Sequence, residues 1–256
     1  MTILKNKNIH SLANNGIVAV FGLVNFLLMA RSLSQEEVGQ WGIFIAGTTL
    51  LERLRTGLMQ SALINYTVGT SHETSRAYHT AAWWLASLIT LAVVVMVEGI
   101  AYFLDTSTHF SSFRLFFNFF SITYFATLPA YHAYWIKLAT QQFLHVLLLR
   151  TITFGGFFLV LVSHYFFFPL TMREVAWAYV SCHSLSSLIA WLLRWSDWKS
   201  YLFVSLEKVK HLFQFGKYSV GSQLGEHLLK SVDSFMIGYF FSASAVAIYQ
   251  VPNKIV

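Results

Sequence analysis

Two apolar stretches of the chain carry charged side chains at helical spacing. In the stretch 215–241, Glu226, Lys230 and Asp233 follow one another at i, i+4 and i+7, which places all three on one face of a helix. A charge at the centre of a membrane span costs roughly 2.5–3.5 kcal/mol on insertion scales. Such residues therefore usually pair with one another or face a wet cavity.

The second group of charges, in the stretch 38–64, is Glu52, Arg53 and Arg55. Glu52 and Arg55 are three residues apart and share a helical face, whereas Arg53 points about a quarter turn away. A guanidinium can hold a phosphate through two parallel hydrogen bonds. Arginines at this position are therefore candidates for binding an anionic group.

These charges support two interpretations. In the first, they line a central aqueous cavity, and the cations contact substrate: Arg53, Arg55 and Lys230. The carboxylates then orient the cations or couple to protons or sodium: Glu52, Glu226 and Asp233. In the second, the charges of 215–241 only neutralise one another, so that a polar helix stays inserted.

Composition places these charges in a membrane protein. The chain has 256 residues, of which 56% are hydrophobic and only 11% are charged, and its mean hydropathy is +0.57. Soluble domains carry roughly 25% charged residues, so a water-soluble globule is excluded. A single cysteine, Cys182, excludes a disulfide scaffold. The net charge of +6 is interpreted as membrane topology, with no nucleic-acid partner.

The apolar runs predict an all-α polytopic bundle, because a span needs about 20 apolar residues and only three prolines interrupt them. An eighth run begins near Val246. Most lysines and arginines between the spans fall on the side of the N-terminus, which we expect to be cytoplasmic. The predicted spans are 12–30, 38–64, 79–104, 112–136, 144–168, 174–195 and 215–241.

The longest polar connection separates two predicted units. Within residues 196–214, Leu202, Leu206, Val209 and Phe213 are spaced for one helical face, which predicts an amphipathic helix on the inner leaflet. An ordinary basic loop is the alternative. We predict a six-helix lobe over residues 1–195, this linker, and the start of a second lobe over residues 215–256.

A short internal repeat supports two lobes. At an offset of 208 residues, Leu33-Ser34 matches Phe241-Ser242, and Val38-Gly39 matches Val246-Ala247. Six spans separate the copies, so both run in the same direction, as in parallel repeats about an axis along the membrane normal. The match is short, and chance similarity is the alternative. We expect one complete lobe followed by the opening of another, as in a truncated protein.

The familiar catalytic motifs are absent. The sequence contains no P-loop, no Gly-x-Gly-x-x-Gly, no His-Glu-x-x-His and no Cys-x-x-Cys. We therefore predict no enzyme activity, no catalytic residue, no metal ligand and no cofactor.

Several segments resemble the polysaccharide transporters, or oligosaccharide flippases of the O-antigen (Wzx) type, which are related to the multidrug and toxin extrusion (MATE) transporters. They are Arg31–Trp41, Leu51–Ile64, Phe215–Ser219, Asp233–Phe240 and Ala245–Tyr249. The resemblance implies a MATE-like fold, in which two six-helix bundles face a central cavity. It implies no enzymatic reaction.

The same resemblance implies a substrate and a location. The substrate is a polyprenyl-pyrophosphate-linked oligosaccharide, moved from the cytoplasmic to the outer leaflet of the bacterial inner membrane for surface polysaccharide such as lipopolysaccharide. A proton or sodium gradient and polysaccharide-assembly proteins are implied partners, beside membrane lipids. Two alternatives remain: a MATE-like drug or metabolite antiporter, and a seven-helix membrane protein that transports nothing.

Overall fold

The computed structural model describes residues 7–104, 108–197 and 204–255, and every regular element in these ranges is a helix. The prediction of an all-α bundle is therefore confirmed. The helices are α1 (Lys7–Ser32), α2 (Gln35–Thr67), α3 (His72–Leu104), η2 (Thr108–Phe113), α4 (Arg114–Ala139), α5 (Phe143–Arg150), η3 (Thr151–Gly155), α6 (Gly156–Phe167), α7 (Met172–Leu192), α8 (Leu206–Phe240) and α9 (Ala243–Ile255).

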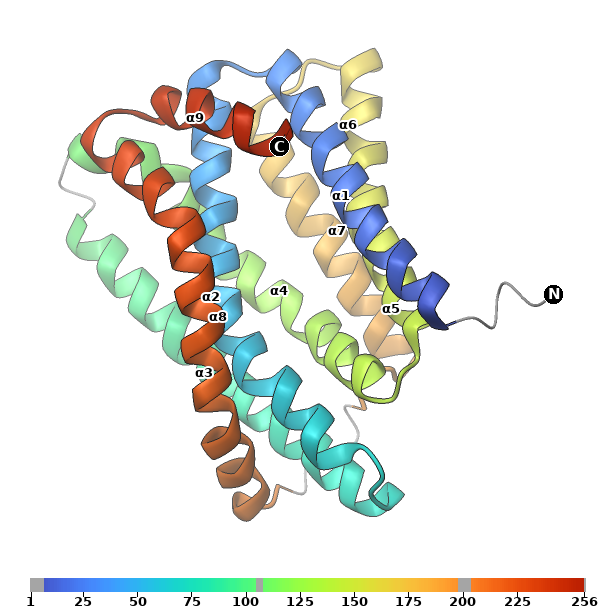
Figure 1. Ribbon diagram of the computed structural model, residues 1–256. Coiled ribbons are helices and arrows are strands. Elements are labelled where there is room, and N and C mark those ends of the chain that lie inside the picture. The colour runs from blue at the N-terminus through green and yellow to red at the C-terminus, as the bar shows by residue number, and fades with distance from the viewer. Residues whose placement is uncertain (1–6, 105–107, 198–203, 256) are drawn as a thin grey trace.

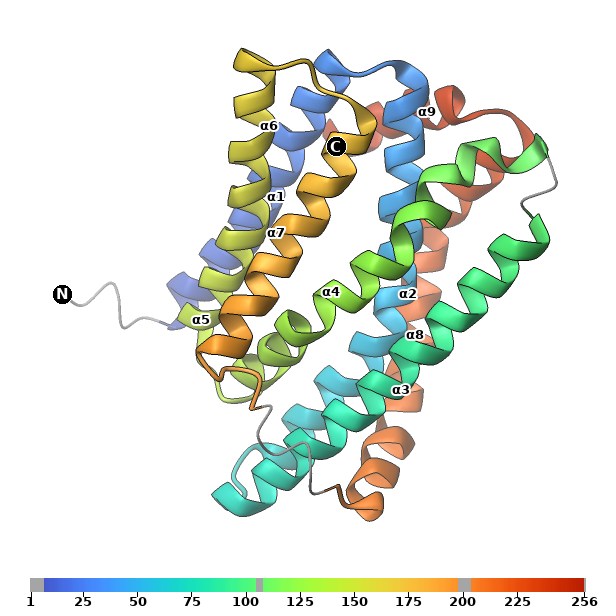
Figure 2. The same ribbon diagram turned by 180° about the vertical axis from the view of Figure 1, so that it is seen from behind.

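The long helices run back and forth between two ends of the bundle (Figures 1 and 2). The upper end in Figure 1 is where α2 begins and α8 ends, and the lower end is where α2 ends and α8 begins. Four segments are long and apolar enough to cross a membrane on length and composition: Ala13–Ser32, His72–Leu104, Phe143–Phe167 and Met172–Leu192. A membrane helix bundle thus fits the structure.

Helix starts follow capping chemistry that is readable in the sequence. At the start of α2, the Ser34 hydroxyl accepts the N–H of Glu37, and the Glu37 carboxylate accepts the N–H of Ser34. At the start of α9, the Ser242 hydroxyl accepts the N–H of Ala245 at 3.2 Å. Each serine accepts a hydrogen bond from the N–H of the residue three positions later. The two serines are 208 residues apart, which is the offset of the internal repeat.

The helix α2 lies at the centre of the bundle and packs against α3, α4, α8 and α9. Small residues let α8 approach it closely. A Cβ added at Gly216 would lie 2.7 Å from the Cα of Leu58. A Cβ added at Gly57 would lie 3.0 Å from the Cα of Val220. Because these two glycines have no side chain, α2 and α8 can pack at this short distance.

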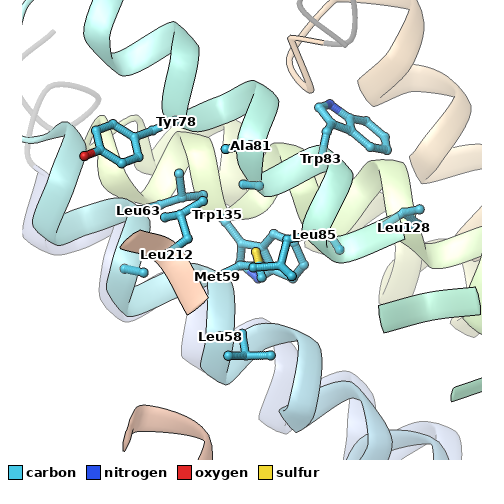
Figure 3. Close-up of a cluster of buried hydrophobic side chains, with 13 residues drawn as sticks. Leu58, Met59, Leu63, Tyr78, Ala81, Trp83, Leu85, Leu128, Trp135 and Leu212 are labelled. Atoms are coloured by element: carbon cyan, nitrogen blue, oxygen red, sulfur yellow. The ribbon is translucent and has the colours of Figure 1, made fainter. Parts of the chain in front are cut away.

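A hydrophobic cluster joins four helices in the lower part of the bundle (Figure 3). Met59 and Leu63 of α2, Trp135 of α4 and Leu212 of α8 are all fully buried. The start of α8 is therefore held by packing.

The helix α4 contains Pro129, which lacks the N–H of a regular helical residue. The hydroxyl of Ser187 on α7 enters the helical hydrogen-bond ladder at this point: it donates to the Ala126 carbonyl and accepts the Ala130 N–H at 3.2 Å. Insertion of a side chain into the ladder is a known cause of helix bending. One serine thus satisfies two backbone groups of α4 and ties α7 to it.

Two predicted segments take a different form. The span 144–168 contains a π-helical turn, Thr151–Gly155, between α5 and α6. The linker 196–214 is helical from Leu206 onward and continues into α8 without a break, whereas Leu202 lies outside the described residues. Packing of Leu212 against α2 and α3 explains the continuity, and the division into lobes stays a prediction.

Candidate functional site

The charges of α2 point in two directions. Glu52 and Arg55 are buried between α2, α3 and α4, whereas Arg53 is exposed on the side of α8. The shared helical face predicted for Glu52 and Arg55 is confirmed, because the two form an ion pair. The structure therefore separates the two arginines that the sequence grouped together.

All five N–H donors of Arg55 have an acceptor. Its Nε donates to Glu52 Oε1 at 3.2 Å, and one terminal nitrogen donates to Glu52 Oε2 and to Thr127 Oγ1. The other terminal nitrogen donates to Thr90 Oγ1 at 3.1 Å and to the Tyr124 carbonyl at 3.2 Å. A guanidinium has no further donor. In this arrangement Arg55 binds α2 to α3 and α4 and offers nothing to a ligand.

Aromatic rings and a hydroxyl complete the shell of this pair. The Arg55 guanidinium lies over the Tyr124 ring at 4.4 Å and faces the Tyr131 ring at 5.5 Å. Glu52 also accepts a hydrogen bond from Thr56 at 3.2 Å. Because both charges are neutralised and bonded, they can remain away from water.

A second set of charges forms an exposed stripe on α8. Lys230 donates to Glu226 at 2.6 Å, and the two side chains are 67% and 69% exposed. One turn further, Asp233 accepts a hydrogen bond from the Tyr249 hydroxyl of α9, also at 2.6 Å. The shared face predicted for Glu226 and Lys230 is confirmed by their contact, and Asp233 is tied to α9.

Arg53 and His227 connect this stripe to α2. Arg53 interacts electrostatically with Glu226 and His227. Within the described residues no hydrogen bond or ion pair occupies its guanidinium. The His227 ring lies close to the backbone of Ala46 on α2. We call the set Arg53, Glu226, His227, Lys230 and Asp233 the polar stripe.

The polar stripe has the chemistry of an anion site with its own counter-charges. Arg53 and Lys230 supply two cations at the surface, and Glu226 and Asp233 hold carboxylates beside them. Among the described residues, no three His, Cys, Asp or Glu side chains are grouped so that they could hold a metal ion. The stripe can therefore bind charged or hydroxylated groups through side chains alone.

The sequence interpretation missed two partners of this site. Tyr249 enters through a turn that folds α9 back toward α8, and its pairing with Asp233 spans 16 residues. The only sequence pattern that pointed to Tyr249 was the internal repeat, in which Tyr249 matches Trp41 at the offset of 208 residues. His227 was visible as a neighbour of the stripe, but its approach to the Ala46 backbone depends on how closely α8 packs on α2.

Comparison with known proteins gives one match. A family model described as "Polysaccharide biosynthesis protein" matches residues 3–256, which is nearly the whole chain. No curated protein matches the chain, and no solved structure does.

Proposed function

The chain belongs to the polysaccharide biosynthesis protein family, and from this premise we propose that it is a flippase for a lipid-linked oligosaccharide. The family supports a polysaccharide-related role in membrane transport. The proposed substrate is a polyprenyl-pyrophosphate-linked oligosaccharide, carried from the cytoplasmic to the outer leaflet of a bacterial inner membrane. The product then enters surface polysaccharide assembly.

One observation carries this proposal: a polar stripe stays exposed on two closely packed helices of an apolar bundle. A hydrated glycan with a pyrophosphate cannot cross hydrocarbon, because each buried charge would cost several kcal/mol. A protein that moves it must offer a wet, charged surface while the polyprenyl chain stays in lipid. Arg53 and Lys230 lie on such a surface.

The charged residues of α2 and α8 have different proposed roles. Arg53 binds the pyrophosphate or an acidic sugar, since a guanidinium with free donors can grip an anion bidentately. Lys230 adds a second cation, which Glu226 holds in place, and Asp233 with Glu226 provides the carboxylates that an ion gradient can act on. Glu52 and Arg55 position α2 and contact no substrate, because their hydrogen bonds are already made.

The test replaces Arg53 and Lys230 by glutamine in the full-length protein, singly and together. We expect surface polysaccharide to fall about tenfold or more in the double variant, as expected for losing charge-assisted hydrogen bonds. Lys217→Gln is the matched control, because Lys217 is another exposed lysine of α8, lies outside the polar stripe and has its ammonium 4.9 Å from the centre of the Tyr218 ring. Normal polysaccharide in the double variant, at equal protein level, would reject the role of the stripe.

The carboxylates of the stripe permit a second transport function. Cationic drugs call for exposed acids and aromatic rings, and Asp233 with Tyr249 provides both. A MATE-like antiporter would change the sensitivity of cells to cationic dyes and would lose this effect in Asp233→Asn. A flippase would leave dye sensitivity unchanged.

A further inference from the structure

A hollow in the upper half of the bundle is lined by none of the residues of the polar stripe. It has a volume of about 280 Å³ and is lined by apolar side chains of α2, α3, η2, α4 and α8, among them Leu51, Met96, Ile100, Phe117 and Phe235. Among the described residues, no polar side chain lines it. Nothing in the proposed transport reaction uses this place.

One wall of the hollow lacks a side chain, and an aromatic ring packs against it. Gly47 of α2 lines it, and the ring of Phe116 packs directly on this glycine, where a Cβ would lie 2.6 Å from a ring carbon. The rings of Phe116 and Phe117 pack edge to face, with centroids 5.4 Å apart, and form the floor on the α4 side. Aromatic rings thus bound the hollow on one side, and aliphatic side chains of α2 and α3 bound it on the other.

Two of the residues that line the hollow are exposed on the surface of α3. Met96 is 48% exposed and Ile100 is 43% exposed, and both line it. They continue into an apolar surface formed by Val95 and Phe103 of the same helix, which is a candidate membrane span. Water does not fill an apolar space without polar partners. In a bilayer, a hydrocarbon chain is the occupant that matches these walls.

A cation directly follows a residue that lines the hollow. Arg114 is the first residue of α4, directly after the lining residue Phe113 and three residues before Phe117. It is exposed, and within the described residues no hydrogen bond or ion pair occupies it. The helix α4 continues directly from η2, and Phe113 at this junction makes no side-chain capping hydrogen bond. The exposed guanidinium of Arg114 can therefore attract an anion beside the hollow.

We propose that the hollow binds one acyl chain of a membrane phospholipid whose phosphate lies at Arg114 and the start of α4. The apolar walls match the hydrocarbon chain, and the exposed guanidinium of Arg114 matches the anionic headgroup. A single phospholipid supplies both groups. The bound chain touches α3, α4 and α8 together. It therefore fills the upper part of the bundle beside Phe235, where α8 would otherwise lie against an empty space.

The experiment uses the full-length protein in bilayers with phosphatidylglycerol that carries a photoactivatable diazirine in its acyl chain. After illumination, mass spectrometry locates the labelled residues. We expect label to concentrate on hollow residues such as Met96, Phe117 and Phe235. Met96→Trp should fill the opening and remove most of this label. Val95→Trp is the matched control, because Val95 is the adjacent residue, is 63% exposed and does not line the hollow.

The headgroup contact has a separate readout. Arg114→Gln should weaken retention of phosphatidylglycerol through detergent washing about tenfold, which corresponds to one charge-assisted hydrogen bond. Arg31→Gln, at an exposed arginine ending α1 at the same end of the bundle, should not. Label spread evenly over the exposed side of α3 and unchanged by Met96→Trp would overturn the proposal. Displacement of the lipid by a polyprenyl phosphate would overturn it too, by assigning the hollow to the transported chain.

Discussion

Arg53 and Arg55 lie two residues apart on α2 and have opposite surroundings. Arg55 is 0% exposed, and Glu52, two threonines and a backbone carbonyl use all its donors. Arg53 is an exposed member of the polar stripe, and within the described residues its donors remain free. One arginine holds three helices together, and the other remains available to a ligand.

The difference shows how to distinguish a structural charge from a binding charge in a membrane helix. Breaking a buried ion pair leaves an uncompensated charge and costs several kcal/mol, whereas an exposed charge contributes little to stability. A charged side chain that binds substrate must keep free hydrogen-bond donors, so it contributes little to the free energy of unfolding. Four sets of substitutions test this contrast, ordered by their expected effect on the free energy of unfolding.

The largest effect is expected at Arg55. Arg55→Ala removes the partner of Glu52 and should lower the free energy of unfolding by about 3–5 kcal/mol. Thermal unfolding in detergent measures the loss. Replacing both members, Glu52→Leu with Arg55→Met, should recover much of it, because two apolar side chains leave no buried charge. A stable single variant would contradict the structural role of the pair.

The contact between α2 and α8 should tolerate change less well than the polar stripe. A side chain at Gly216 would overlap the Leu58 backbone, so Gly216→Val should cost about 1–3 kcal/mol, as overpacking does. Gly221→Val is the control, since a Cβ at that glycine of α8 meets no other atom. Equal unfolding temperatures for the two variants would mean that α8 does not pack on α2 this closely.

A smaller effect is expected from a polar contact across the same helices. Ser61 and Ser219 share a hydrogen bond of 3.1 Å between α2 and α8. Hydrogen bonds between membrane helices contribute about 0.6 kcal/mol on average. Ser61→Ala should therefore lower stability by about that amount, measured by the same unfolding curves, and Ser219→Ala should add little to it.

The smallest effect on stability is expected at the polar stripe. Arg53→Gln and Lys230→Gln should leave the unfolding temperature unchanged, while transport falls. Comparison of unfolding with surface polysaccharide in the same variants separates the two roles. A marked loss of stability in Arg53→Gln would place this arginine in the same class as Arg55.

Patterns within single helices were sufficient to predict much of this fold. Apolar run length predicted helices that reverse direction, and spacing predicted that Glu52 and Arg55 share a face and that Glu226 meets Lys230. The partners of Arg55 were not predictable, because Thr90 and Thr127 are ordinary side chains until α3 and α4 pack on α2. The same holds for Tyr249 and for the apolar hollow, which depend on contacts between distant segments.

The Arg55 network has a consequence for how the chain is made. Two of its acceptors are synthesised well after it: Thr90 comes 35 residues later and Thr127 comes 72 residues later. At about 5–20 residues per second, the ribosome needs roughly 4–14 s to reach Thr127. Glu52 precedes Arg55 and is available throughout this interval, whereas the hydrogen bonds to α3 and α4 are not yet formed. The network is complete only when α4 packs on α2.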